Sequence, residues 1–199
     1  MSTRGALLRA GEHLFARHGV GGTRTKQIVE RAGQGNDSAV QYHFGSREGL
    51  VAAIMTKHLD RMEPLWQSTL PAVRATPEVP VLVDSLLTPL AEELLSEDGR
   101  DFLRIIPGVA GGAGVRTHEP PLPLHGTALA ENLELLEGGC LLVLATDVGR
   151  ERIAMAISMI TAALADRAHR VDGHLPVLLT HDEFRTNLTT MISAALLAR

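Results

Sequence analysis

Residues 42–50 read Tyr42-His43-Phe44-Gly45-Ser46-Arg47-Glu48-Gly49-Leu50 and mark the border between a short helix and a long one. Gly45 is a natural stop for the first helix, because glycine adopts the left-handed conformation that ends many helices. Ser46 is a preferred N-cap residue, and Glu48 places a negative charge in the first turn, where the helix dipole favours it. Apolar residues then recur at helical spacing as far as Met62. We therefore predict a long helix that begins after Ser46.

The chain before this border carries signals for three shorter helices. We expect the first over 3–18 and the second over 25–32, each followed by a glycine that stops it. The third is expected over about 36–43. Gly33 stands between the second and third, where the turn of a helix-turn-helix needs a left-handed residue. Three good N-cap types open the third helix: Asn36, Asp37 and Ser38.

Polar side chains gather on the second and third of these helices. At the start of the second, Thr25 and Lys26 can meet phosphate together with backbone amides. Amide and hydroxyl groups on the third suit base edges, and the residues at its end suit phosphate or a thymine methyl. Tyr42 could instead be half buried, since its ring is apolar and its tip polar. The predicted DNA-binding residues are Thr25, Lys26, Asn36, Ser38, Gln41, Tyr42, His43 and Arg47.

Residues 6–56 resemble the N-terminal domain of the TetR family of transcriptional regulators. The segment 42–50 carries most of the resemblance, because Tyr-His-Phe-Gly-Ser followed by a basic residue and then Leu is specific at this place. The other matching positions are 6–15 (ALLRAGEHLF), Gly19, Thr23, Ile28 and Ala32-Gly33.

Two departures from the family pattern lie in the third helix and the turn before it. Phe44 follows Gly33 by eleven residues, one more than is usual, and Gln34 stands where an apolar residue normally packs. The resemblance implies a helical C-terminal domain with an effector pocket, and a dimer formed by the last two helices. It also implies repression as the usual outcome, although activation stays open.

The rest of the chain also reads as helical, without the alternating pattern of strands. We predict an all-α protein with a helix-turn-helix DNA-binding domain at 1–48 and an effector-binding and dimerisation domain at 49–199. Prolines at 64, 71, 77 and 80 indicate a frayed or kinked stretch, and glycines and prolines over 107–123 indicate a loop. Further helices are expected over 81–97, 100–107, 126–145 with a break at Gly138-Gly139, 148–170 and 182–198.

Apolar residues in the second domain suggest two further sites. Two stripes at helical spacing would let the last two helices pair with those of a second copy in a four-helix bundle, although they could also be plain core. The dimer candidates are Ile153, Ile157, Ile160, Leu164, Phe184, Leu188, Met191 and Ala195. The effector-pocket candidates, chosen from apolarity and position, are Trp66, Leu70, Phe102, Ile105, Ile106 and Leu133.

Charge and composition narrow the class of function. The net charge is -4, but residues 1–60 hold eight Lys and Arg against five Asp and Glu, whereas the remainder is acidic. Attraction to phosphate depends on such local potential. The chain has one cysteine, Cys140, which we expect to be a buried thiol, and no apolar run long enough for a membrane span, so we expect a cytoplasmic protein without a cofactor.

These observations favour a ligand-responsive transcriptional regulator, most simply a repressor, that binds a palindromic operator as a homodimer. One alternative is an all-α small-molecule or metal-binding protein that no longer binds DNA, although no histidines stand at metal-ligand spacing. A helical enzyme is the other rival. We do not expect an enzyme, because Ser85, Ser96 and Ser158 lack the context of a nucleophile and no acid–base set is evident.

Overall fold

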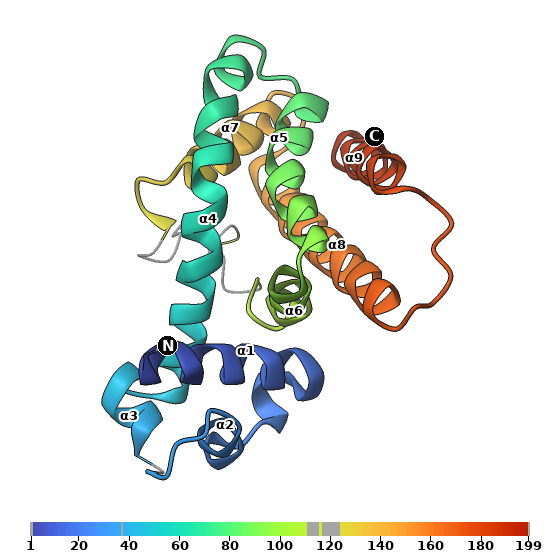
Figure 1. The fold of residues 1–199 in the computed structure, drawn as a ribbon. Coiled ribbons are helices and arrows are strands. Elements are labelled where there is room, and N and C mark those ends of the chain that lie inside the picture. The colour runs from blue at the N-terminus through green and yellow to red at the C-terminus, as the bar shows by residue number, and fades with distance from the viewer. Residues whose placement is uncertain (1, 37, 111–115, 117–123, 199) are drawn as a thin grey trace.

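The computed structural model describes residues 2–36, 38–110, 116 and 124–198, and in this part of the chain all regular structure is helical. Helices α1 to α3 gather around the start of α4, and α4 then runs upward beside the second group, which α5 to α9 form (Figure 1). The helices are α1 (Thr3–Gly22), α2 (Thr25–Arg31), α3 (Ala39–Phe44), α4 (Arg47–Ala75), α5 (Val79–Glu92), α6 (Glu97–Ile105), α7 (Ala128–Leu141), α8 (Thr146–Asp172) and α9 (His181–Leu197), with short 3-10 turns η1 (Glu93–Leu95) and η2 (Ile106–Gly108).

The first three helices pack around the beginning of α4 and form a small apolar core. Leu7, Phe15, Ile28 and Leu50 are among its fully buried members. The predicted stop at Gly19 is confirmed, since this residue has a φ of 72° and interrupts the helical backbone of α1 before its last turn. The N-terminal third of the chain is thus a three-helix domain completed by α4.

The segment 42–50 folds as its sequence predicts. Gly45 has a φ of 75° and ends α3, while the Ser46 side chain accepts a hydrogen bond from the Gly49 N–H at 2.9 Å and caps α4. Gly49 lies against the preceding helix, because a Cβ built on it would be 2.0 Å from the carbonyl oxygen of Phe44. Only a residue without a side chain fits this junction.

Helix α4 is longer than we predicted. It continues through Pro64 and Pro71 to Ala75, so the expectation of a frayed stretch after Met62 was wrong. A proline inside a helix removes one hydrogen bond and costs about 3 kcal/mol. Trp66 and Val73 are nevertheless buried in the core of the second domain, and such burial offsets that cost.

The second domain encloses a larger core between α4, α5, α7, α8 and α9. Two expectations for it need correction. Residues 81–97 are not one helix, because η1 ends the first segment and Ser96 caps α6 by accepting from the Gly99 N–H at 3.1 Å. Helix α7 is also unbroken at Gly138-Gly139. Gly139 packs against α5, since a Cβ there would lie 3.4 Å from Val79 Cγ2, and this contact is compatible with a continuous helix.

Helices α8 and α9 begin and end within two residues of the predicted bounds. The predicted loop over 107–123 lies mostly outside the described residues. The predicted domain border at residue 48 falls in the first turn of α4, which contributes side chains to both cores.

Candidate nucleic-acid interface and internal cavity

The turn between α2 and α3 contains the left-handed residue that the sequence predicted. Gly33 has a φ of 67°, and its N–H donates to the carbonyl oxygen of Glu30 at 3.0 Å. Gln34 then donates from its side chain to the Ala32 carbonyl at 3.1 Å and from its backbone to the Val29 carbonyl at 3.0 Å. The turn therefore closes through hydrogen bonds, without the apolar residue that the family pattern has at this position.

Helix α3 is anchored by one side and exposed on the other. Ala39 and Val40 are buried in the small core, and Phe44 packs against it. Gln41 is exposed, and Tyr42 exposes 83% of its surface, which excludes the half-buried alternative. An exposed polar face on a helix held firmly from behind is the arrangement that readers of the major groove use.

Asn36 lies before α3 and not on it. Its Oδ1 accepts a hydrogen bond from the Ser38 N–H at 2.9 Å, and its carbonyl oxygen accepts from the Ala39 N–H at 2.9 Å. Asn36 thus shapes the entry into α3, where Ser38 is the N-cap residue. Both side chains are exposed. Asp37, the third N-cap type in this stretch, lies outside the described residues.

The other predicted contact residues lie around α3. Thr25 begins α2 and is half buried, and the exposed Lys26 has its Nζ 3.9 Å from Glu30 Oε1. Arg47 is half buried and donates from Nη1 to the Thr23 carbonyl at 2.9 Å, so it ties the start of α4 to the segment before α2. Phosphate contact by Arg47 remains a prediction.

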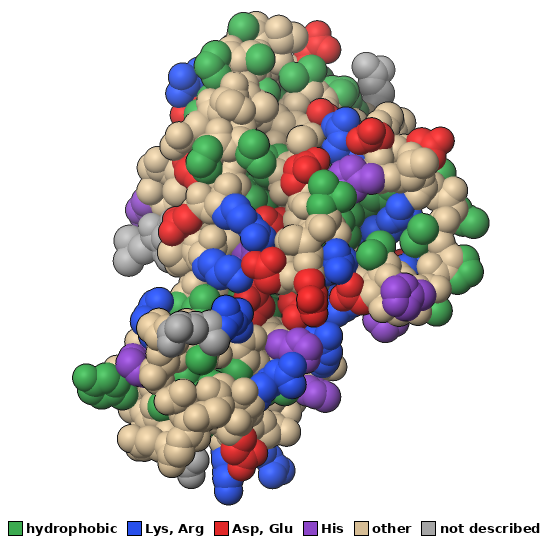
Figure 2. Space-filling view, viewed as in Figure 1, with side chains coloured by type: hydrophobic (Ala, Val, Ile, Leu, Met, Phe, Trp, Pro, Cys, Tyr) green, Lys and Arg blue, Asp and Glu red, His purple; other side chains and the backbone are tan. Residues whose placement is uncertain are grey.

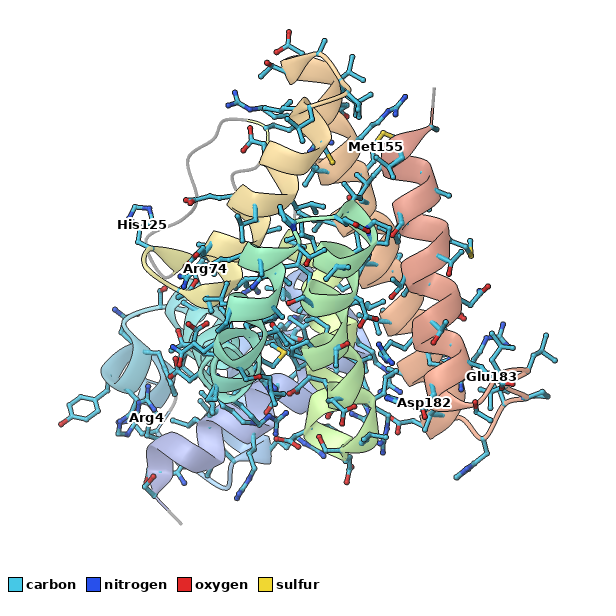
Figure 3. The ribbon with its side chains drawn as sticks, turned by 90° about the horizontal axis from the view of Figure 1, so that it is seen from above. Arg4, Arg74, His125, Met155, Asp182 and Glu183 are labelled. Atoms are coloured by element: carbon cyan, nitrogen blue, oxygen red, sulfur yellow. The ribbon has the colours of Figure 1, made fainter. Side chains whose placement is uncertain are left out.

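The end of α3 forms a small aromatic group. The His43 ring meets Tyr42 edge-on with 4.9 Å between the ring centroids, and it meets Phe44 at 6.4 Å. Arg4 of α1 places its guanidinium 5.0 Å from the centroid of the Phe44 ring and is exposed beside α3 (Figure 3). The sequence analysis missed Arg4, because the pattern of α1 reveals only its apolar face.

Charged side chains of both signs gather where the two domains meet (Figure 2). At the centre His58 of α4 is fully buried, with its Nδ1 2.7 Å from Glu93 Oε2 and its Nε2 hydrogen-bonded to Glu12 of α1. Lys57 Nζ lies 2.8 Å from Glu12 Oε2 and 3.0 Å from Asp98 Oδ2. We call the residues Glu12, Lys57, His58, Arg61, Glu93 and Asp98 the junction network.

The junction network fixes the protonation of its members. Burial lowers the pKa of His58, but hydrogen bonds and charge from Glu12 and Glu93 outweigh it, so the pKa is raised. Burial raises the pKa of Glu93, whereas His58 and Arg61 lower it by more, and the net shift is downward. Burial also raises the pKa of Asp98, but Lys57 and Arg61 lower it by more, so that this pKa falls to about 2. These shifts favour the protonated form of His58 and the carboxylate forms of Glu93 and Asp98.

A cavity of about 390 Å³ lies inside the second domain, among α4, α5, α7, α8 and neighbouring segments. Four of the effector-pocket candidates line it: Trp66, Phe102, Ile106 and Leu133. The other two candidates do not line it. Leu70 is buried in the core without reaching the cavity, and Ile105 packs into the small N-terminal core, because α6 lies between the two cores.

The predicted dimer residues mostly face inward. Ile153, Ile160, Leu164 and Leu188 are buried within this single chain, which agrees with the plain-core alternative for these four residues. Ile157 and Phe184 are partly buried against the same core, whereas Met191 and Ala195 are exposed. The apolar side of α8 and α9 thus fills the chain's own core, and other residues form their outer surface.

Two features are absent from the described part of the chain. Among the described residues no three His, Cys, Asp or Glu side chains are grouped closely enough to hold a metal ion. None of the helices in the described part of the chain is both long and apolar enough to cross a membrane.

Comparison with known proteins agrees with this geometry. Residues 7–54 match the family model of bacterial regulatory proteins of the tetR family. A candidate tetR family transcription regulator from Shewanella sp. PV-4 superposes with a TM-score of 0.61, at 17% identity and 98% coverage of both chains, which shows a shared fold. A candidate fatty acid metabolism regulator from Clostridium perfringens reaches a TM-score of 0.45 at 14% identity, covering 98% of this chain and 100% of that one, and supports no argument. No curated protein matches significantly.

An all-α chain with an exposed helix α3 behind a Gly33 turn defines the class of helix-turn-helix DNA-binding regulators. Residues 7–54 form an N-terminal domain of the type found in the tetR family of bacterial regulatory proteins. The resemblance read from 42–50 is thereby confirmed, and the general function is DNA binding in transcription regulation.

Proposed function

We propose that the protein is a ligand-responsive repressor that binds a palindromic operator as a dimer, with α3 in the major groove of each half-site. The observation that carries this proposal is α3 itself. Val40 and Phe44 hold the helix against the small core, while Gln41 and Tyr42 are exposed on its other side.

The side chains around α3 divide into two groups by chemistry. Gln41 suits bidentate recognition of adenine in the major groove, and Ser38 and Asn36 can reach base edges beside it. Lys26, Tyr42 and His43 suit phosphate, as does the missed Arg4. At the end of the N-terminal domain that points away from the second domain, Lys and Arg side chains lie beside acidic ones (Figure 2).

A dimer through α8 and α9 fits the surface that these helices leave uncovered. Met155 and Met159 are exposed one turn apart on α8, and Met191 is exposed on α9. Met155 lies near the C-terminal end of α9, where Arg152 also donates to the Leu196 carbonyl at 3.1 Å (Figure 3). Small residues accompany these methionines and permit close helix approach, namely Ser158, Ala162 and Ala194.

The ligand response has a physical route from the cavity to the DNA-binding domain. Phe102 of α6 lines the cavity and stacks on His58, which hydrogen-bonds Glu12 of α1. A ligand that displaces Phe102 would thus act on the contact between α6 and α1. A coupling of about 1–3 kcal/mol changes operator affinity by roughly 5–150-fold.

A mobility-shift assay with DNA that flanks the gene, at two salt concentrations, tests the proposal. The wild-type protein should bind this DNA more tightly than an unrelated duplex, and higher salt should weaken both complexes. Gln41→Ala should reduce that preference while leaving the thermal unfolding midpoint unchanged, because the side chain is exposed. Equal affinity for both duplexes at both salt concentrations would refute a sequence-specific regulator.

A further inference from the structure

We infer that the internal cavity takes a predominantly apolar molecule that carries no negative charge. This inference rests on the proposed function only in that a ligand is expected at all, and it concerns the chemistry of that ligand. The volume of the cavity, about 390 Å³, falls in the range of small-molecule sites, which span about 300–1,000 Å³.

The inner wall of the cavity offers almost nothing to a polar ligand. Its described lining residues include no charged side chain, and the hydroxyl groups belong to Thr56 and Thr161 alone. The Thr161 hydroxyl already donates within α8, to the carbonyl oxygen of Ile157 at 2.9 Å. Trp66 Nε1–H also has a partner, the Leu86 carbonyl at 3.3 Å. A carboxylate placed here would lose its hydration and find no cation among the described lining residues, which is strongly unfavourable.

One end of the cavity is acidic. A smaller cavity of about 240 Å³ adjoins it, since both are lined by Thr56, Leu59 and Trp66, and the smaller one adds Asp60 and Glu63 of α4. Glu63 Oε1 accepts the Ala128 N–H at 2.6 Å, at the start of α7. These two carboxylates repel an anionic end group, whereas a hydroxyl or an ammonium group can donate to Asp60.

Three probes with one apolar body and different end groups test this inference: decanol, decylamine and decanoate. Each is titrated calorimetrically into the full-length wild-type protein at neutral pH, below the concentration at which the probe self-associates. We expect decanol and decylamine to bind and decanoate to bind at least about tenfold more weakly, because its charge is buried without a partner. Decanoate binding as tightly as decanol would overturn the inference, and so would the absence of binding by all three.

Three variants test whether the probes bind in this cavity. Ala156→Leu narrows it from α8 and should weaken decanol binding, whereas Ala163→Leu, on the same helix but outside the lining, should not. Asp60→Asn should weaken decylamine binding relative to decanol binding by about two- to fivefold, the range of an exposed ion pair. Decanol binding that Ala156→Leu leaves unchanged would overturn the assignment, provided that circular dichroism shows the variant folded.

A parallel titration of the protein–operator complex separates this inference from the proposed function. If decanol binds in the cavity and the operator stays bound, the ligand chemistry holds and the ligand response is refuted. If the protein binds no operator at all while the order of the three probes is as expected, the regulator proposal fails and the inference about the cavity stands.

Discussion

The ring of Phe102 lies parallel to the imidazole of His58, with 4.2 Å between the ring centroids and an angle of 11° between the planes. Phe102 belongs to the cavity wall, and His58 belongs to the junction network that reaches α1. One pair of stacked rings therefore joins the apolar site to the DNA-binding domain. Movement of Phe102 on ligand binding would alter the buried contact between His58 and Glu12.

The junction network predicts a loss of stability in alkaline solution. The pKa of His58 is raised in the folded protein, so its stabilisation is fully present below the unfolded value of about 6.5 and is lost as the pH rises through the folded pKa. Urea unfolding from about pH 6 to pH 9 should show this decline. His18→Gln, at an exposed histidine, should leave this decline of stability with pH unchanged. His58→Gln should remove the decline and lower the stability at every pH.

The same prediction can be checked without a variant. His58 faces Glu12, Glu93 and the neighbouring Arg61, and both of its ring nitrogens contact carboxylates. Ring chemical shifts from NMR should therefore show that His58 loses its proton at a higher pH than an unperturbed histidine, whose pKa is about 6.5. If every histidine deprotonates near its ordinary pKa, the network is not charged as we describe.

Gly49→Ala should destabilise the protein, because the new Cβ would lie 2.0 Å from the carbonyl oxygen of Phe44 and the backbone would have to move. Overpacking of this kind costs about 1–3 kcal/mol of unfolding free energy. Gly138→Ala, at an exposed position in α7 with open space around its Cα, should instead gain up to about 1 kcal/mol. Equal effects in urea unfolding would refute the role given to the junction of α3 and α4.

Lys26→Ala should weaken binding to all duplex sequences alike and reduce the salt slope by about one unit, since one phosphate contact is lost. Fluorescence anisotropy over a salt series measures both effects. Arg74→Ala is the matched control, because Arg74 pairs with Glu131 at the far end of α4 from the DNA-binding domain (Figure 1). An unchanged slope for Lys26→Ala would remove its phosphate role.

Met191→Arg should shift the protein from dimer to monomer in sedimentation velocity, because it places a charge on the exposed apolar surface of α9. Leu178→Arg provides the comparison. Leu178 is 96% exposed but lies in the segment between α8 and α9, away from the proposed interface. A dimer that withstands Met191→Arg, or a wild-type monomer, would contradict the proposed arrangement.

Local signals let the sequence predict the DNA-binding domain well. The stops at Gly19, Gly33 and Gly45 and the cap at Ser46 depend on neighbouring residues, and all four are present in the structure. The course of α4 through Pro64 and Pro71 could not be predicted, because long-range burial of its other residues overrides the local preference against proline.

The internal sites were harder to predict, because periodicity shows that a helix face is apolar but not what covers it. Ile153 and Leu164 fill the core of one chain, whereas exposed methionines beside them form the outer surface. The junction network left no signal either. Glu12, His58 and Glu93 are far apart in the sequence and look like ordinary polar positions until α1, α4 and η1 meet.

Selection of bound sequences from a random duplex pool tests the central claim most directly. The wild-type protein should enrich a two-fold symmetric sequence whose half-sites are separated by about one helical turn or a multiple of it. Gln41→Ala should relax the preference at one base position in each half and leave the others intact. Enrichment of no sequence at low salt, or of one without two-fold symmetry, would contradict a dimer that reads DNA with α3.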